Sequence, residues 1–344
     1  MNAAAKNYDG VNKYIRITDI DEASSTYTDK DIVSPDGVLT DNYLVNNRDI
    51  LLARTGASTG KSYLYKKSDG KLYYAGFLIR ANVTTHDPYF VFSQLHTHRY
   101  WRWVSIMSAR SGQPGINSQE YSSFPIYTTS IEEESKIAKL LSLLDERIAT
   151  QNKIIEDLKK LKSAISENLF NAVKGDVVIL SEICEIIKGK QVNGEFLSEK
   201  GKYYVMNGGT EPSGYYSDYN VEANTISISE GGNSCGYVQF NTSPFWSGGH
   251  CYTIQKIADN VDNLYLYHYL KSKEDAIMKL RIGSGLPNIQ KKDLAIFKIK
   301  IPTAKQQKVI STFLSSLERK AEIEEIIQNS MLKEKQYLLQ QMFI

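Results

Sequence analysis

The sequence contains a long internal repeat, which constrains the fold more than any single motif does. The segment from Ser111 to Phe170 aligns without a gap on the segment from Ser284 to Phe343. Identical residues at matching positions include Gly112 and Gly285, Pro114 and Pro287, Ile116 and Ile289, Phe124 and Phe297, Ile137 and Ile310, Leu141 and Leu314, and Leu144 and Leu317. A repeat of this length indicates two copies of one structural unit, so the fold must accommodate an internal symmetry.

Each copy of the repeat carries the start signal of a long helix. Ser130 with Glu133 has the pattern of a capping box, and Thr303 with Gln306 has the same pattern in the second copy. The acidic run 132–134 also places negative charge at the positive end of the first helix dipole. The sequence therefore predicts one long helix over residues 129–171 and a second over 302–344.

Apolar side chains recur at intervals of three and four in both predicted helices, which is the spacing of a coiled coil. The expected helix-pairing residues are Leu141, Leu144, Ile148, Ile155, Leu158, Ile165 and Leu169, interrupted by Gln151 and Lys162, and Leu314, Leu317, Met331 and Leu338 in the second helix. Each helix could instead pack only on its own globular neighbour. The stripe from Leu141 to Leu169 is about 43 Å long, which is more than a small domain needs. We therefore expect the helices to pair antiparallel, as a bar with one globular lobe at each end.

The segments outside the helices, residues 1–128 and 172–301, have the pattern of two similar strand-rich domains. Both alternate short strands with glycine-rich loops and end in a helix. The first is expected to hold strands at Asn12–Ile20 and Asp49–Arg54, a strand pair or one bent strand at Leu72–Val83, and a helix at Tyr89–Ser108. The second is expected to hold strands at Gly201–Val205 and Thr225–Ser229 and a helix at Leu264–Leu280. The fold class is therefore α+β, with two similar globular domains joined by two long helices. The segment Val177–Gly189 has no counterpart in the first domain, so that domain is expected to lack its opening element.

Composition limits the classes of function that are open to the chain. A length of 344 residues suffices for two domains with sizeable cores. The net charge of +2 shows no global basicity, so any DNA-binding surface must be local. Three scattered cysteines fit a reducing compartment rather than a disulfide framework. Without an apolar run of about 18 residues or a signal peptide, we expect a cytoplasmic protein with no membrane partner.

The loop Gly56–Ser62 (GASTGKS) resembles a phosphate-binding loop, but its spacing is wrong. That motif requires four residues between its glycines, whereas Gly56 and Gly60 enclose only three. A nucleotide hydrolase is therefore a disfavoured alternative. We interpret the segment as a surface loop in which Arg54, Ser58, Thr59 and Lys61 reach phosphates or base edges.

The second domain has a corresponding loop after its strand at Thr225–Ser229. This loop contains Glu230, Asn233 and Ser234, which are interpreted as recognition residues. The remaining candidate DNA contacts are Arg110, His250 and Arg281. His250 and Cys251, with Cys235 near them, leave a zinc site open, although a structural role for the histidine is favoured and no metal is expected. The run His96–Trp103 mixes basic and aromatic residues, for which packing in the core is favoured over stacking on nucleic acid.

These features together resemble the specificity (S) subunits of type I restriction-modification enzymes. The resemblance covers nearly the whole chain and rests on its repeated plan and on DILLARTGASTGKS, GQPGINSQEYSSFPI and GLPNIQKKDLAIFKIKIPTAKQQ. It implies two target-recognition domains, each reading half of a split site in double-stranded DNA, with the conserved helices as a spacer. It also implies docking of two methyltransferase (M) subunits and, through that core, of restriction (R) subunits.

The resemblance implies a chain that reads DNA and is not itself an enzyme. No cofactor is expected on it, whereas the partner subunits would use S-adenosylmethionine, ATP and Mg²⁺. Its N-terminus departs from the family pattern, as noted above. The alternative from another class is a scaffold that binds only proteins.

Overall fold

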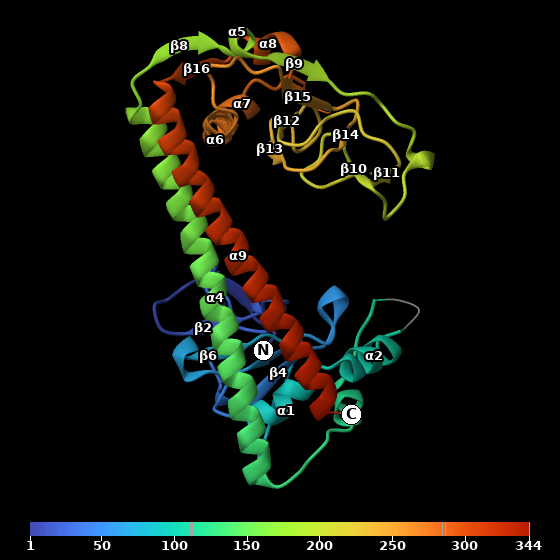
Figure 1. Cartoon of the computed structure of the whole chain (residues 1–344). Coiled ribbons are helices and arrows are strands. Elements are labelled where there is room, and N and C mark those ends of the chain that lie inside the picture. Colours follow the sequence, from blue (N-terminus) through green and yellow to red (C-terminus); the bar gives the residue numbers. More distant parts are fainter. Residues whose placement is uncertain (110–112, 284, 286, 344) are drawn as a thin grey trace. The chain divides into compact units, whose positions relative to one another are not determined.

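The computed structural model describes residues 1–109, 113–283, 285 and 287–343 (Figure 1). By compactness the chain divides into unit 1, which comprises Met1–Lys153 and Glu325–Ile344, and unit 2, which comprises Ile154–Glu324. Two long helices, α4 (Ile131–Ala172) and α9 (Ala304–Met342), each contribute one half to each unit. No helix in the described part of the chain has the length and apolar character that crossing a bilayer requires.

Unit 1 is built around strand β4 (Asp49–Ala53), of which every residue is buried. β4 is the centre of an antiparallel sheet β5-β4-β7, while β2 pairs with β6 in parallel and β1 pairs with β3 antiparallel. The other strands are β1 (Ala4–Asn7), β2 (Lys13–Ile15), β3 (Val33–Asp36), β5 (Ser62–Leu64), β6 (Leu72–Tyr74) and β7 (Leu78–Asn82), and the helices are η1 (Ile17–Asp19), η2 (Asp41–Tyr43), η3 (Gly56–Ser58), η4 (Lys67–Asp69), α1 (Pro88–Gln94), α2 (His98–Met107) and α3 (Ser118–Ser122).

Two expectations for the elements of unit 1 were wrong in detail. The single helix expected over Tyr89–Ser108 is two helices, because the Thr97 hydroxyl accepts a hydrogen bond from the Tyr100 N–H and starts α2 afresh. The strand expected over Asn12–Ile20 covers only Lys13–Ile15, and η1 begins at Ile17. The segment Leu72–Val83, for which a strand pair or one bent strand was expected, is two strands that belong to different sheets.

Unit 2 begins with β8, α5 and β9, which have no counterpart among the elements of unit 1, and from β10 onward follows a similar order of strands and helices. Its main sheet is β13-β12-β15-β9, and two smaller sheets are β11-β10-β14 and β16-β8. Its elements are β8 (Asp176–Ile179), α5 (Leu180–Ile183), β9 (Glu185–Lys188), η5 (Gly194–Phe196), β10 (Tyr203–Met206), β11 (Tyr215–Tyr216), β12 (Thr225–Ser229), β13 (Val238–Asn241), β14 (Trp246–Ser247), β15 (Cys251–Gln255), α6 (Asn263–Ser272), α7 (Glu274–Met278), α8 (Lys291–Ala295) and β16 (Lys298–Ile301).

The internal repeat extends through the strands of both units. The sheet β5-β4-β7 matches β13-β12-β15, and the parallel pair β2–β6 matches the parallel pair β10–β14. Gly60 and Gly236 close the loops after β4 and β12, and both have φ of 95°. This backbone conformation favours glycine, which explains why both copies keep it. In unit 2, β15 pairs with β9 as well as with β12. In unit 1, β7 is the counterpart of β15, and among the described strands it pairs only with β4.

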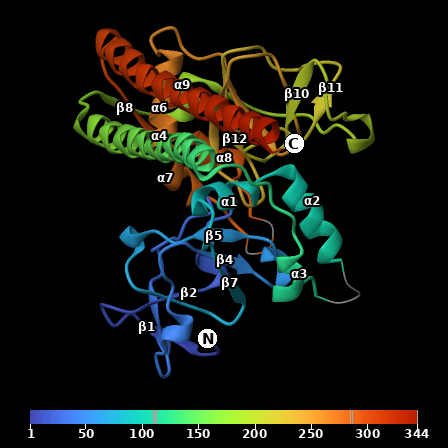
Figure 2. The ribbon, with the colours of Figure 1, turned by 90° about the horizontal axis from the view of Figure 1, so that it is seen from below.

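The long helices lie side by side in both views (Figures 1 and 2). In unit 1, Ala138 and Leu141 near the start of α4 share a core cluster with Leu339 near the end of α9. In unit 2, Phe170 near the end of α4 shares a cluster with Leu314 near the start of α9. Early residues of each helix thus meet late residues of the other, which makes the pairing antiparallel. Every expected helix-pairing residue is buried or half-buried.

Two ion pairs lie across the helix pair at positions that the repeat relates. In unit 1, Lys335 Nζ of α9 lies 2.5 Å from Asp145 Oδ1 of α4. In unit 2, Lys162 Nζ of α4 lies 2.6 Å from Glu318 Oε1 of α9. The lysine that interrupts the apolar stripe of α4 is therefore paired with a charge on the other helix. Charged pairs of this kind set the orientation and register of coiled-coil helices.

Replacing Leu314 with alanine is expected to destabilise unit 2 by about 2–5 kcal/mol, because a buried leucine leaves a cavity when it is truncated. Leu314 is 0% exposed in the core of unit 2. On the same helix Val309 is 62% exposed, so Val309→Ala is the matched control and should change stability by less than about 0.5 kcal/mol. Chemical unfolding monitored by hydrogen exchange in unit 2 measures both. Equal effects at the two positions would contradict the packing of α9 described above.

Candidate nucleic-acid interface

Equivalent backbone hydrogen bonds hold one loop in each unit. In unit 1, the Arg54 N–H donates to the Phe77 carbonyl at 3.0 Å, and the Arg54 carbonyl accepts from Ile116 at 2.9 Å. In unit 2, Glu230 makes the same two bonds, its N–H to the His250 carbonyl at 2.9 Å and its carbonyl to the Ile289 N–H at 2.8 Å. Arg54 and Glu230 therefore occupy equivalent positions, as do Phe77 and His250.

In the loop of unit 1, the four predicted residues differ in how much they can contact. Arg54 is exposed and Ser58 is half-buried. The Lys61 side chain is 18% exposed, with its Nζ 2.9 Å from Glu22 Oε2. Thr59 is 7% exposed, and its hydroxyl donates to the Gly56 carbonyl at 2.8 Å, which closes the loop on itself. Arg54 is thus the predicted residue best placed for a partner in solution.

The backbone of this loop cannot hold a phosphate in the way a nucleotide-binding loop does. Such a loop points its N–H groups at the phosphate oxygens. Here four of the N–H groups donate to carbonyls of the protein: Gly56 to Pro114, Thr59 to Gly56, Gly60 to Ala53 and Lys61 to Ser58. The hydrogen bonding therefore agrees with the spacing in disfavouring a nucleotide site.

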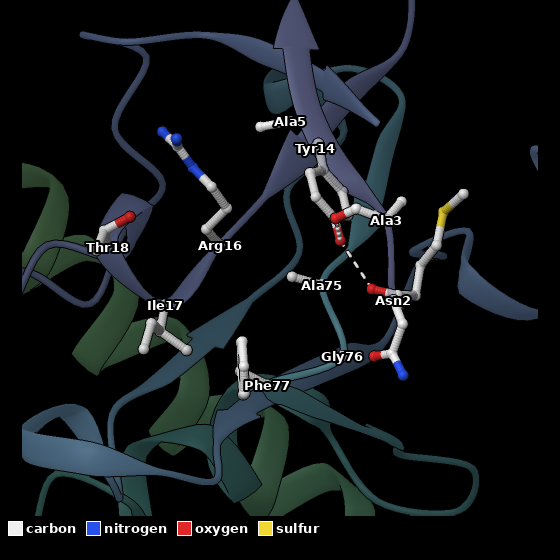
Figure 3. Close-up of a pocket in the computed structure, with 11 residues that line it drawn as sticks. Asn2, Ala3, Ala5, Tyr14, Arg16, Ile17, Thr18, Ala75, Gly76 and Phe77 are labelled. Atoms are coloured by element: carbon white, nitrogen blue, oxygen red, sulfur yellow. Dashed lines mark hydrogen bonds between the residues drawn. The ribbon is translucent and has the colours of Figure 1, made fainter. Parts of the chain in front are cut away.

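Unit 1 contains an apolar hollow of about 520 Å³ (Figure 3). It is lined by residues that follow the parallel strands β2 and β6, among them Arg16 and Phe77, and by the first residues of the chain. The Arg16 guanidinium donates to both carboxylate oxygens of Asp19, at 2.9 and 2.7 Å, which raises the pKa of the arginine. Phe77 is 61% exposed at the edge of the hollow. The hollow thus offers apolar contact near the backbone of Arg54, whose N–H donates to the carbonyl of Phe77.

In the loop of unit 2, Glu230 is buried and supports its neighbours. Its carboxylate is 2.5 Å from Lys188 Nζ and 3.5 Å from His250 Nδ1, and it accepts a hydrogen bond from the Tyr252 hydroxyl at 3.1 Å. Glu230 itself is only 8% exposed, whereas the side chains of Lys188 and His250 are 52% and 63% exposed. Glu230 was expected to contact DNA itself. Its burial fits that role less well than a role in positioning the exposed side chains of Lys188 and His250.

Cys235 and Cys251 of unit 2 are buried thiols near Glu230 and His250. Burial raises the pKa of Cys251 to about 11 and also raises that of Cys235, so both thiols stay protonated at neutral pH. The Cys235 thiol donates to the Glu230 carbonyl at 2.9 Å. Within the described residues, no group of three or more potential ligands is arranged to hold a metal ion.

The structure thus sorts the predicted contact residues by exposure and adds three that the sequence did not single out. Exposed are Arg54, Asn233, His250 and Arg281; half-buried are Ser58, Lys61 and Ser234; buried are Thr59 and Glu230; and Arg110 lies outside the described residues. The additions are Arg16, Phe77 and Lys188. Phe77 could have been found from its alignment with His250, whereas Lys188 reaches Glu230 only because β9 pairs with β15.

Comparison with known proteins identifies the family. The family model described as the type I restriction modification DNA specificity domain matches residues 1–160 and 173–333. The chain belongs to this family. The suspected relationship is therefore confirmed, and the match falls in two stretches, as the repeat requires.

Individual relatives agree with this assignment. A Mycoplasma pneumoniae protein named as a type I specificity subunit is 33% identical over 145 residues, which cover 42% of this chain and 38% of that protein. The specificity subunit of the Methanocaldococcus jannaschii type I restriction enzyme MjaVIII is 24% identical over 322 residues, covering 81% of this chain and 74% of that one. The match to the first relative thus spans less than two thirds of that protein's length.

Solved structures of the family share the fold. The crystal structure of the S subunit of a type I system from M. genitalium superposes with a TM-score of 0.70 at 19% identity, over 98% of this chain and 89% of that one. A structure from work on complex assembly and conformational transition of the type I system gives a TM-score of 0.58 at 17% identity, over 95% and 90%. The predicted α+β fold, with two similar domains and two paired helices, is confirmed.

Proposed function

We propose that this chain is the sequence-reading subunit of a type I restriction-modification complex, with one half of a split DNA target read by each unit. The observation that carries the proposal is that one loop framework is repeated with different side chains. Arg54 and Phe77 in unit 1 stand where Glu230 and His250 stand in unit 2. Because the backbone of the loop is held in the same way in both units, both loops can enter a groove of the DNA in the same orientation. Because their side chains differ, the two loops can read different bases.

The same proposal assigns catalysis and cofactors to partner subunits. Two methyltransferase subunits would dock on the helices, and restriction subunits would bind to the assembly of this chain with the methyltransferases. The complex would work in the cytoplasm, and the partner subunits would use S-adenosylmethionine, ATP and Mg²⁺. The helix pair supports this docking because it exposes large apolar side chains, a common mark of protein–protein contact. They include Leu140, Leu143 and Leu161 on α4, and Val309, Phe313, Ile323 and Ile326 on α9, each at least 45% exposed.

The experiment that tests the proposal is co-purification with a methyltransferase subunit, followed by sequencing of methylated sites. A bipartite methylated motif is the expected result. A scaffold that binds only proteins would co-purify but would direct no methylation motif. DNA binding should also weaken steeply with salt, because phosphate contacts release counterions.

The isolated chain is expected to show no ATP hydrolysis. In the loop Gly56–Ser62, the N–H groups of Gly56, Thr59, Gly60 and Lys61 donate to carbonyls of the protein and are not available to phosphate oxygens. Phosphate release from ATP, measured with the wild-type chain and with Lys61→Ala, should stay at the background of a buffer control in both. ATP turnover that disappears in Lys61→Ala would contradict this prediction and favour the nucleotide hydrolase.

A further inference from the structure

Arg48 in unit 1 links the start of one strand to the loop that follows another. It directly precedes β4, and its backbone has φ of 72°. Its guanidinium donates to the Val83 carbonyl at 2.6 Å and to the His86 carbonyl. Val83 and His86 belong to the loop between β7 and α1. One arginine side chain thus joins β4 to that loop through charge-assisted hydrogen bonds.

Asn224 is the counterpart of Arg48 in unit 2. It directly precedes β12 and has φ of 59°, so the second copy keeps the left-handed backbone but has a short neutral side chain in place of a long cationic one. The loop after β15 corresponds to the loop after β7. Within it, Lys256 directly follows the strand, as Val83 does in unit 1.

The carbonyls that receive the Arg48 guanidinium have counterparts in unit 2. Val261 precedes the N-cap residue of α6, as His86 precedes that of α1. No backbone N–H of the described residues donates to the carbonyl of Lys256 or of Val261. Unit 2 therefore repeats the acceptors of this arrangement without the arginine that binds them in unit 1.

A polar cavity of about 530 Å³ lies at this place in unit 2. Its lining includes Asn224, Lys256 and Val261, and its volume is within the range of about 300–1,000 Å³ that is usual for small-molecule sites. Ile254 and Val261, which are 2% and 7% exposed, supply apolar wall. The cavity therefore offers contact to a short alkyl chain next to polar groups.

The charges around the cavity favour a cation. Glu222 and Asp259 both line it, and both are exposed. The one lysine in the lining, Lys256, has its Nζ 2.9 Å from Glu185 Oε1, so its charge is already paired. A cation in the cavity would thus be attracted by two carboxylates.

Asn263, which also lines the cavity, adds an acceptor that lacks a donor. Its Nδ2 donates to the Asn224 carbonyl at 2.7 Å. Because a carbonyl can only accept, this bond fixes which end of the amide is nitrogen. The Oδ1 atom is buried and has no hydrogen-bond partner among the described residues. A buried acceptor without a donor is unfavourable, so a ligand that brings N–H groups would be held there.

We propose that this cavity of unit 2 binds a guanidinium group carried on an alkyl chain, in the place that the Arg48 side chain fills in unit 1. A guanidinium presents several N–H donors in one plane and no acceptor, which suits a site made of carbonyls, an amide oxygen and carboxylates. The group can belong to a free small cation or to an arginine of another chain. The inference does not depend on DNA reading by either unit.

The proposal is tested by titrating the full chain with n-butylguanidinium at concentrations too low to denature it. The expected result is saturable binding at one site, with slowed amide hydrogen exchange in residues 254–261. Because the ligand binds the folded state, the melting temperature of unit 2 should rise by about 2–4 °C. Uncharged n-butylurea has nearly the same shape and is the matched control. Equal binding of the two compounds would overturn the proposal.

Variants of unit 2 locate the binding. Asn224→Arg copies the arrangement of unit 1, so it should raise the melting temperature of unit 2 without ligand and weaken butylguanidinium binding at least tenfold. Glu222→Gln with Asp259→Asn should also weaken binding at least tenfold. Glu199→Gln, at an exposed position that does not line the cavity, should leave binding unchanged. Undiminished binding in Asn224→Arg and in the double variant would overturn the assignment to this cavity.

A variant of unit 1 tests the comparison with Arg48 directly. Arg48→Asn should lower the melting temperature of unit 1, and butylguanidinium should restore part of the loss whereas butylurea should not. Binding to the wild-type chain without this rescue would overturn the comparison on which the proposal rests.

A second ligand distinguishes the two sources of the guanidinium group. A glycine–arginine–glycine peptide with blocked ends should bind as tightly as butylguanidinium if the site takes an arginine of another chain. Binding of butylguanidinium alone would support a free small cation. Binding of neither ligand to the wild-type chain would overturn the proposal, whether or not the chain reads DNA.

Discussion

In a complex with the methyltransferase subunits proposed above, the chain with Asn233→Ala is expected to lose discrimination in one half of the proposed DNA target only. Asn233 is exposed in the loop after β12, in unit 2. A direct base contact contributes about 1–3 kcal/mol, so discrimination at the affected base pair should fall by roughly tenfold to a hundredfold. Sequencing of methylated sites would show which base pairs of the motif become degenerate.

The corresponding variant in unit 1 is Arg54→Ala, at an exposed position of the matching loop. It should blur the other half-site and leave the half-site affected by Asn233→Ala intact. Thr242→Ala, at an exposed position outside both loops, serves as the control and should leave the motif unchanged. Equal blurring of both half-sites by either variant would show that the two units do not read one half-site each.

The helices and the repeat were predictable because their signals are local and periodic. An apolar residue at every third or fourth position specifies a helix face without reference to the rest of the chain. Spacing alone could not show what the polar residues on that face do. Lys162 looked like an interruption of the stripe, but it pairs with Glu318, which lies far away in sequence on the antiparallel helix.

The candidate site was less predictable, because long-range contacts decide which side chains face outward. Thr59 and Glu230 have residue types that suit DNA contact, yet both are buried. Thr59 is committed to the Gly56 carbonyl, and Glu230 is held between Lys188 and Tyr252. The sequence located the two loops correctly, since each follows a strand of the repeat, but it could not show the orientation of the side chains within them.

Shortening the helix pair is expected to shorten the nonspecific gap in the DNA target and leave both half-sites unchanged. The deletion removes Asn152–Leu158 from α4 and Glu322–Gln328 from α9. Each segment lies between the ion-paired residues of its helix, Asp145 and Lys162 in α4, and Glu318 and Lys335 in α9. Seven residues are one heptad, so the apolar stripes stay in phase. Each helix becomes shorter by about 10 Å at about 1.5 Å per residue.

The antiparallel pairing decides which residues have to be removed together. The repeat relates Leu158–Ala164 to Met331–Tyr337, but deleting those two segments would remove Lys162 and Lys335 while leaving Glu318 and Asp145 without them. The chosen segments instead contain Asn152 and Gln328, which are hydrogen-bonded to each other and are lost as a pair. Both ion pairs, and the register that they set, are therefore kept.

DNA rises about 3.4 Å per base pair, so a spacer shortened by about 10 Å corresponds to a gap smaller by up to about three base pairs. Bending of the DNA can absorb part of this change, and a reduction of one or two base pairs would still support the helices as the spacer. Deleting only Asn152–Leu158 is the control: α9 then keeps its full length, its residues no longer match those of α4, and the chain should lose stability rather than direct a shorter gap. A double deletion that folds, directs methylation and leaves the gap unchanged would show that the helices do not set the spacing, because both run from one unit into the other and both would have been shortened equally.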